Sequence, residues 1–299
     1  MTTADWIAAD WGNTNLRLWA LDAQDTVLAE REAPQGFSTL EPGDWEPLLL
    51  ATCGDLLAPD RATPVLICGA AGSRGSWREA PYRTVPCLPN GGAEAVAVAG
   101  TDPRLSVHIL PGINQLAPPA VMRSEETQVA GFLAGQPDFD GVVCLPGTHT
   151  KWVHVSAGEV VSFMSTMTGE LFGLLSKRSI LRRTIAAEGH DEAAFLAGVE
   201  ASFRDPGKLL NALISLRAKA IVAGLDPVLA RSTLSGLLVG ADLTAARAYW
   251  LGREVAVIGA EPIAGHFAKA LAAQGVPVRM AEGHAMALAG LVAAHEVLA

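Results

Sequence analysis

The fold is decided by the stretch Ile7-Ala8-Ala9-Asp10-Trp11-Gly12-Asn13-Thr14-Asn15-Leu16-Arg17-Leu18-Trp19. An apolar run leads into an acidic residue, a glycine and small polar side chains, and apolar residues then alternate with others. This pattern predicts a β-hairpin with a polar tip. Gly12 lets a ligand approach the backbone, while Asn13, Thr14 and Asn15 offer amide and hydroxyl groups to an anion. Asp10 is a hard oxygen ligand that suits the water shell of Mg²⁺. The alternative is an ordinary turn made of turn-forming residues.

Length and composition indicate a globular protein with a large core. The 299 residues fit one large domain or two medium ones, and 50% of them are hydrophobic. The formal net charge of −9 disfavours broad binding to nucleic acid or to an anionic membrane, because both depend on many Lys and Arg contacts. An anionic ligand must therefore meet a locally positive site.

Targeting and metal-binding patterns are not apparent in the sequence. The start, Met1 to Trp6, lacks a basic segment followed by an apolar one, and no apolar run approaches the roughly 20 residues of a membrane span. We therefore expect a cytoplasmic protein. The four cysteines, Cys53, Cys68, Cys87 and Cys144, form no C-x-x-C pair, so buried free thiols are expected rather than a zinc site.

Two halves of the chain repeat one order of predicted elements. After the hairpin, the first half is expected to have strands at Val27–Ala33, Val65–Cys68 and Val107–Leu110 and helices at Trp45–Leu57 and Ala93–Ala99. Ser124 is the expected N-cap of a helix that begins the second half. This half has expected strands at Val142–Leu145, Lys151–Val155, Val160–Met164, Glu254–Ile258 and Val276–Met280, and expected helices from 169 to 248, at Ile263–Ala273 and at Ala285–Leu298.

This repeat predicts an α/β protein of two related lobes with a ligand cleft between them. Residues 1–115 and 285–299 are expected to form the N-terminal lobe. Residues 116–284 are expected to form the C-terminal lobe, which includes the helical insertion.

A second polar hairpin tip, Pro146-Gly147-Thr148-His149-Thr150-Lys151, stands at the equivalent place in the second half. If the two tips face each other, Asp10 and Thr14 on one side and Gly147 and Thr148 on the other would grip a polyphosphate. Gly259 follows a strand and precedes a helix, where backbone N–H groups are open to a ligand. Taken alone, such a glycine is more often an ordinary strand-to-helix turn.

Together these motifs resemble the superfamily of sugar kinases, actin and heat-shock ATPases. More closely, the chain resembles the 2-dehydro-3-deoxygalactonokinases in four blocks, D-W-G-N-T-N-L-R at 10–17, M-R-S-E-E-T-Q at 122–128, P-G-T-H-T-K-W at 146–152 and M-T-G-E-L at 167–171. The resemblance implies an actin-like, ribonuclease H-like fold with a nucleotide cleft, and ATP and Mg²⁺ as cofactors. It also implies transfer of the ATP γ-phosphoryl group to the terminal hydroxyl of 2-dehydro-3-deoxy-D-galactonate, a sugar acid of galactonate breakdown, to give the 6-phosphate.

The resemblance also assigns roles to residues. Asp10 would act through Mg²⁺ and Gly259 would lie beside the adenosine. The phosphates would be approached by Gly12, Asn13, Thr14, Gly147, Thr148 and Lys151. Related kinases carry an aspartate as the base at the start of the helix before the second hairpin, where this chain has Glu125 and Glu126. The alternative is that both acids only complement the positive end of the helix.

The carboxylate of the sugar acid requires a positive partner, and Arg17, Arg74 and Arg123 lie beside the motifs. We expect Ser73, Arg74 and Trp77, in a glycine-rich loop from 69 to 77, to belong to the sugar-acid pocket.

Three other functions remain open at this point. They are a kinase of the same fold with another acceptor, an actin-like or chaperone-like ATPase without a small-molecule acceptor, and a sugar-sensing domain without catalysis. The role of His149 is undetermined, and the oligomeric state is not fixed by sequence, which leaves a homodimer open.

Overall fold

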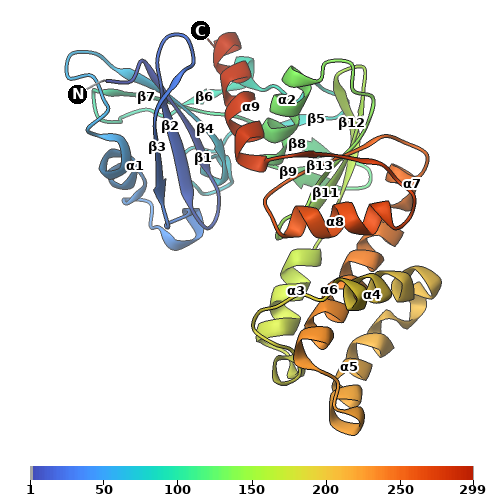
Figure 1. The fold of residues 1–299 in the computed structure, drawn as a ribbon. Coiled ribbons are helices and arrows are strands. Elements are labelled where there is room, and N and C mark those ends of the chain that lie inside the picture. The colour runs from blue at the N-terminus through green and yellow to red at the C-terminus, as the bar shows by residue number, and fades with distance from the viewer. Residues whose placement is uncertain (1–2, 299) are drawn as a thin grey trace. The chain divides into compact units, whose positions relative to one another are not determined.

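Contacts within the chain define two compact units in the computed structural model, which describes residues 3–298 (Figure 1). The first unit comprises residues up to 139, residues 156–162 and residues from 282 onward, and the second comprises residues 140–155 and 163–281. This division differs from the expected boundary at 115, because the segment 116–139 packs with the first unit. Residues 1, 2 and 299 of the expected N-terminal lobe lie outside the described residues.

The main sheet of the first unit has the strand order β3-β2-β1-β4-β7-β6. Strands β1, β2 and β3 are antiparallel neighbours, whereas β4 runs parallel to β1 and β7 parallel to β4. The bounds are β1 Trp6–Trp11, β2 Leu16–Leu21, β3 Val27–Ala33, β4 Thr63–Gly69, β6 Val96–Ala97 and β7 Leu105–Ile109. The predicted hairpin is therefore present, with its tip between β1 and β2.

Successive side chains of a strand point to opposite faces of the sheet. Each face of this sheet is covered by one helix. Ile7 and Trp11 pack in one core cluster with residues of α1 (Trp45–Cys53). Trp6 and Ala8 pack in another with residues of α9 (Gly283–Leu298). In Figure 1, α1 lies to the left of the sheet and α9 to its right.

A small sheet of three strands in the first unit has no counterpart among the predictions. Its order is β5-β8-β9, with bounds Tyr82–Thr84, Gly112–Gln115 and Ala120–Met122. The predicted helix Ala93–Ala99 is wrong. A single 3₁₀ turn, Gly92–Glu94, is followed there by β6, whose backbone pairs with β7 at the edge of the main sheet. Pairing with the sheet overrides the helical preference of this alanine-rich segment.

The second unit repeats the topology of the first. Its sheet has the order β12-β11-β10-β13-β14, in which β11 is antiparallel to β10 and β13 is parallel to β10. The bounds are β10 Gly141–Leu145, β11 Thr150–Ser156, β12 Glu159–Thr166, β13 Val255–Ile258 and β14 Val278–Ala281. Each sheet thus begins with a hairpin whose first strand has a later parallel neighbour. The predicted α/β fold of two related lobes, of the actin-like type, is confirmed.

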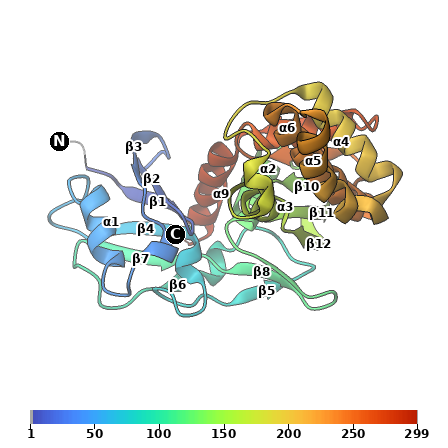
Figure 2. The same cartoon turned by 90° about the horizontal axis from the view of Figure 1, so that it is seen from below.

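The inserted section between β12 and β13 is helical, as predicted. Figures 1 and 2 both show its helices α4, α5 and α6 side by side. The bounds are α3 Thr168–Lys177, α4 Glu192–Arg204, α5 Leu209–Ala223, α6 Pro227–Ala245 and α7 Arg247–Trp250, and α8 Ile263–Ala272 follows β13. Within residues 3–298, no helix has the length and apolar character needed to cross a membrane.

Helices α2 (Glu125–Gly135) and α9 approach each other through two glycines of the first unit. A Cβ atom on Gly131 would lie 2.0 Å from the carbonyl oxygen of Met286, and one on Gly290 would lie 1.9 Å from that of Thr127. Both contacts are with backbone, which cannot move aside without shifting a helix. The start of α2 is therefore fixed against α9 at close range.

We expect Gly131→Ala to lower the free energy of unfolding by about 1–3 kcal/mol, because the added methyl group forces the two helices apart. Urea unfolding would measure the change. Gly135→Ala is the matched control, since a Cβ on Gly135, in the same helix, meets nothing within 4 Å. Equal stability of the two variants would contradict the tight α2–α9 contact.

Candidate active site

The tip of the first hairpin is exposed at Asn13, Thr14 and Asn15, and its backbone is held from one side. The N–H groups of Phe37 and Ser38 donate to the carbonyl oxygens of Gly12 and Asn13 at 3.1 and 3.2 Å, and the Ser38 hydroxyl also donates to Asn13 O at 2.5 Å. The tip is therefore braced by the 3₁₀ turn Phe37–Thr39.

Asp10 lies at the end of β1, where two side chains approach one of its carboxylate oxygens. The Ser124 hydroxyl donates to Asp10 Oδ1 at 2.8 Å, and the Cys68 thiol lies 3.5 Å from the same atom. Burial raises the pKa of Cys68 well above its usual value, and the negative charges of Asp10 and Glu126 add to this effect, so the thiol remains protonated. Within residues 3–298, no side chain donates to Asp10 Oδ2.

The two acids at the start of α2 differ in exposure. Glu125 is half-buried, and its Oε2 accepts a hydrogen bond from the backbone N–H of Arg123 at 2.9 Å. Glu126 is only 2% exposed, and its Oε1 accepts from the Ser124 N–H at 3.1 Å and from the Thr127 hydroxyl at 3.2 Å. Both carboxylates therefore bind backbone N–H groups at the helix start, but only Glu125 is accessible to a ligand.

Glu126 has a buried carboxyl group that titrates near neutral pH. Burial, with a further contribution from the charge of Glu125, raises the pKa of Glu126 to about 7. Its Oε2 atom has no hydrogen-bond partner in the described part of the chain. The uncharged form is therefore favoured up to neutral pH.

The glycine-rich loop contacts the first hairpin through aromatic rings. Trp77 is half-buried, and its ring meets that of Trp11 edge to face, with centroids 6.0 Å apart. Ser73 is partly buried and Arg74 is exposed in the same loop. The structure thus places Trp77 of this loop beside the hairpin that carries Asp10.

Two of the three candidate arginines are already engaged within the first unit. Arg17 forms ion pairs with Glu30, at 3.4 Å, and with Glu32. The Arg123 guanidinium donates to Ala80 O at 2.8 Å and lies 4.4 Å from the centre of the Tyr82 ring. Arg74 has no such partner among residues 3–298, which makes it the best placed of the three to meet a free carboxylate.

The second hairpin, between β10 and β11, packs against the start of α3. Thr148 and His149 are exposed, and the Thr148 carbonyl accepts the backbone N–H of Glu170 at 2.9 Å. His149 Nε2 lies 2.6 Å from Glu170 Oε2. A Cβ on Gly169 would lie 2.2 Å from Gly147 O, so this position admits no larger residue.

Lys151, the third predicted phosphate ligand of this hairpin after Gly147 and Thr148, lies in β11. It is only 6% exposed, and it precedes Trp152, whose ring packs in the core beside Phe267. Neighbouring residues of a strand point to opposite faces, so Lys151 lies on the face away from that core.

Asp242 in α6 is a buried residue that the sequence did not single out. Its carboxylate accepts hydrogen bonds from Trp152 Nε1 at 2.8 Å and from the hydroxyls of Thr166 and Thr168 at 2.6 Å each. Burial raises the pKa of Asp242, while the three hydrogen bonds oppose that shift. This carboxylate connects α6 to β11 through Trp152, to the end of β12 through Thr166 and to the first residue of α3 through Thr168.

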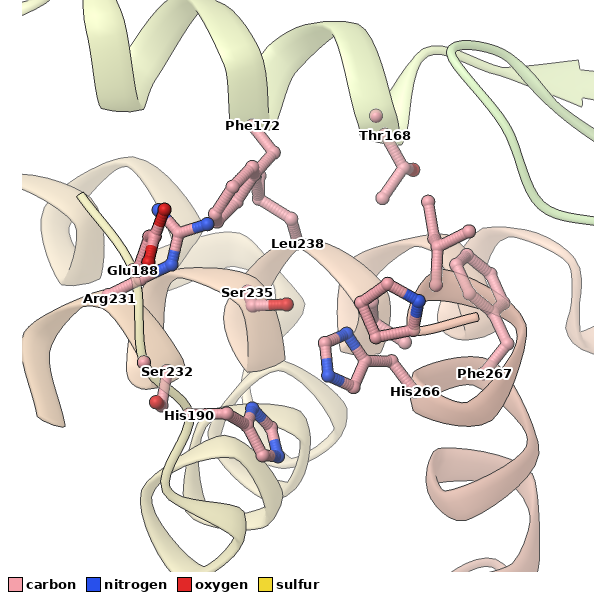
Figure 3. Close-up of a pocket in the computed structure, with 15 residues that line it drawn as sticks. Thr168, Phe172, Glu188, His190, Arg231, Ser232, Ser235, Leu238, His266 and Phe267 are labelled. Carbon is pink, nitrogen blue, oxygen red and sulfur yellow. The ribbon is translucent and has the colours of Figure 1, made fainter. Parts of the chain in front are cut away.

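A cavity of about 470 Å³ opens in the second unit between α3, α6 and α8 (Figure 3). Phe172, Leu238 and Ile263 supply apolar walls, and Ser235 and two histidines supply polar groups. The rings of His190 and His266 stack at 4.5 Å. Burial lowers the pKa of His266, and the neighbouring His190 lowers it further.

The cavity adjoins both nucleotide motifs predicted in this unit. Thr168 and Gly169, at its rim, begin the helix that packs on the second hairpin, and Pro262 and Ile263 begin the helix after Gly259. Gly259 directly follows β13, and its N–H donates to Ala281 O at 3.2 Å. Most of the lining, from Glu188, His190 and α6, lies in the helical insertion, where sequence patterns identified no ligand site.

Asp10 fits the donor set of a magnesium site. Mg²⁺ is commonly held by one or two carboxylates together with waters and substrate phosphates. Among residues 3–298 no three His, Cys, Asp or Glu side chains gather as a complete metal cage. A single carboxylate with one oxygen lacking a protein donor is consistent with a metal that the nucleotide brings.

Comparisons with known proteins agree with this fold and with these motifs. The family described as 2-keto-3-deoxy-galactonokinase matches residues 10–294. A relative named as a probable 2-dehydro-3-deoxygalactonokinase of Rhizobium meliloti is 35% identical over 302 residues, covering 98% of each chain. The 2-dehydro-3-deoxygalactonokinase of Escherichia coli is 31% identical over 293 residues, covering 97% of each.

A solved structure shows the same fold. The crystal structure of a protein assigned as a 2-dehydro-3-deoxygalactonokinase, from Sinorhizobium meliloti, has a TM-score of 0.91 and 33% identity, covering 98% of this chain and 99% of that one. The matching family and these relatives identify the chain as a sugar-acid kinase. The chain belongs to the 2-keto-3-deoxy-galactonokinase family, which confirms the family predicted from the four sequence blocks.

We expect Glu126 to make stability depend on pH. Its pKa is about 7 in the folded protein, against 4.5 as the ordinary value. A raised pKa means that its stabilising effect is complete below pH 4.5 and is lost as the pH rises to 7. The loss amounts to about 3 kcal/mol at most. Urea unfolding from pH 4.5 to 7.5 would show this decrease in the wild type, and Glu126→Gln should lack it. Parallel curves for the two proteins would contradict the assignment.

Proposed function

We propose that this protein transfers the γ-phosphoryl group of ATP to the terminal hydroxyl of 2-dehydro-3-deoxy-D-galactonate, giving the 6-phosphate. The observation that carries this proposal is the repeated hairpin. Each sheet begins with a pair of antiparallel strands joined by a polar, glycine-containing tip, at 12–15 and at 146–149. The names of the relatives supply the acceptor, and Arg74 supplies a cation for the carboxylate of a sugar acid.

The proposal assigns the cavity of the second unit to the adenosine. Its volume of about 470 Å³ falls in the range of small-ligand pockets, and apolar walls with a few polar groups suit a flat heterocycle. Its rim is formed by the first residues of α3, which pack on the second hairpin, and of α8, which follow Gly259. A nucleotide base in the cavity would therefore have its phosphates directed toward Gly147 and Thr148, whereas Lys151 lies on the opposite face of β11.

Phosphoryl transfer requires positioning, charge neutralisation and a group that accepts the hydroxyl proton. We assign the last role to Glu125, because its carboxylate is partly exposed whereas that of Glu126 is buried. As the oxygen of the acceptor hydroxyl bonds to the γ-phosphorus and ADP leaves, the proton of that hydroxyl passes to the Glu125 carboxylate. Mg²⁺, with Asp10 holding its water shell, would neutralise charge on the phosphates. Gly12, Asn13 and Thr14 would approach these phosphates from the first hairpin.

An ADP-release assay with different acceptors tests the function. We expect turnover that requires 2-dehydro-3-deoxy-D-galactonate and Mg²⁺, with slower turnover of the gluconate-derived epimer. ADP release without any acceptor would favour an actin-like or chaperone-like ATPase. Turnover with a different sugar only would leave the kinase and remove the acceptor, and no turnover at all would favour a sugar-sensing domain.

Glu125→Gln tests the base. We expect kcat to fall at least 100-fold, because Gln cannot accept the proton, while the KM for ATP changes little. Asp138→Asn, an exposed position beyond the far end of α2, is the control and should retain full activity. An undiminished rate in both Glu125→Gln and Glu126→Gln would reject a base at this helix start.

A further inference from the structure

Ser124 has a backbone conformation that a serine rarely adopts. Its φ is 90° and its ψ is −40°, immediately before the first residue of α2. Among residues 3–298, two other non-glycine residues have positive φ, Asp25 at 60° and Ala157 at 52°. Both of these values are close to the left-handed helical region, whereas φ of Ser124 lies well beyond it. Backbone strain of this kind tends to be kept where the surrounding structure and function require it.

The side chain of Ser124 does not perform the usual task of its position. A serine before a helix normally accepts a hydrogen bond from a backbone N–H of the first turn, but Ser124 makes no such bond. Its hydroxyl donates instead to Asp10 Oδ1 at 2.8 Å. The backbone N–H of Ser124 is bound by Glu126, and that of Arg123 by Glu125, so two carboxylates bind N–H groups at this helix start.

We propose that Ser124 is a positioning residue, which fixes the carboxylate of Asp10 and the start of α2 in one geometry. This inference rests on the proposed function, because it takes Asp10 as the carboxylate that faces the magnesium–nucleotide complex and Glu125 as the base. In this proposal Ser124 acts through Asp10 and Glu125.

The geometry explains why both oxygens of Asp10 matter. The hydroxyl of Ser124 and the thiol of Cys68 both approach Oδ1, which fixes the rotation of the carboxylate. Oδ2 then keeps one direction in which to meet a hydrated cation. Because Ser124 directly precedes Glu125, the same hydrogen bond also sets the distance between the metal-facing carboxylate and the base. Catalytic groups held in advance lose less free energy to reorganisation during the reaction.

Two substitutions separate the hydroxyl from the backbone strain. Ser124→Ala removes the hydroxyl and keeps a Cβ at positive φ, whereas Ser124→Gly removes both. We expect both variants to lose at least tenfold in kcat and to need several-fold more Mg²⁺ for half-maximal rate. We expect their thermal midpoints without ligands to diverge, with Ser124→Gly the more stable of the two. Calorimetry of ADP binding, with and without Mg²⁺, should show that both variants lose most of the affinity that Mg²⁺ adds.

Ala157→Gly is the matched control for the backbone, because it relieves a positive φ at an exposed turn and should leave kcat and the Mg²⁺ requirement unchanged. Full activity and an unchanged Mg²⁺ requirement in Ser124→Gly would overturn the proposal, as would activities that simply follow the thermal midpoints. A wild type that turns over the acceptor, together with unaffected variants, rejects Ser124 alone. A wild type without turnover rejects the proposed function and this inference with it.

Discussion

The hydrogen bond from Ser124 to Asp10 joins the first strand of the sheet to the residue before α2, 114 positions along the chain. A short hydroxyl group can span this gap only if the start of α2 comes close to the end of β1. The glycine contacts between α2 and α9 meet this requirement, because they fix the helix within the first unit. Backbone packing, rather than the local preference of a serine, thus determines where the candidate base lies.

The second unit uses a carboxylate in a different way. Asp242 is buried, which carries a desolvation cost, and three hydrogen bonds from Trp152, Thr166 and Thr168 offset it. These bonds connect β11 and the end of β12 to the beginning of α3. The beginning of α3 in turn supports the hairpin tip through Gly169 and Glu170. In both units, therefore, a carboxylate ties together an end of a strand and a start of a helix, although the two acids occupy unrelated positions in the sequence.

Much of this fold could be predicted because its central strands are fully buried and therefore appear as apolar runs. Strands β1, β4, β10 and β13 match such predicted runs closely. Strands β5, β8 and β9 have only three or four residues each, so no apolar run marks them. The polar hairpin tip around Gly12 and Thr14 could be located from the sequence because its residues lie in one loop. The burial and pairing of a side chain could not be predicted where they depend on tertiary contacts. Asp242 lies in an ordinary helical pattern, and only packing shows that Arg17 is already paired and that Glu126 is buried.

The first unit is assembled from segments at both ends of the chain, because α9 covers one face of the sheet that begins at Trp6. During synthesis, the first 139 residues leave the ribosome long before this helix exists. The apolar face of the sheet around Trp6, Ala8 and Leu66 therefore remains uncovered while the second unit is synthesised. We therefore expect the second unit to complete its folding before the first unit on the ribosome.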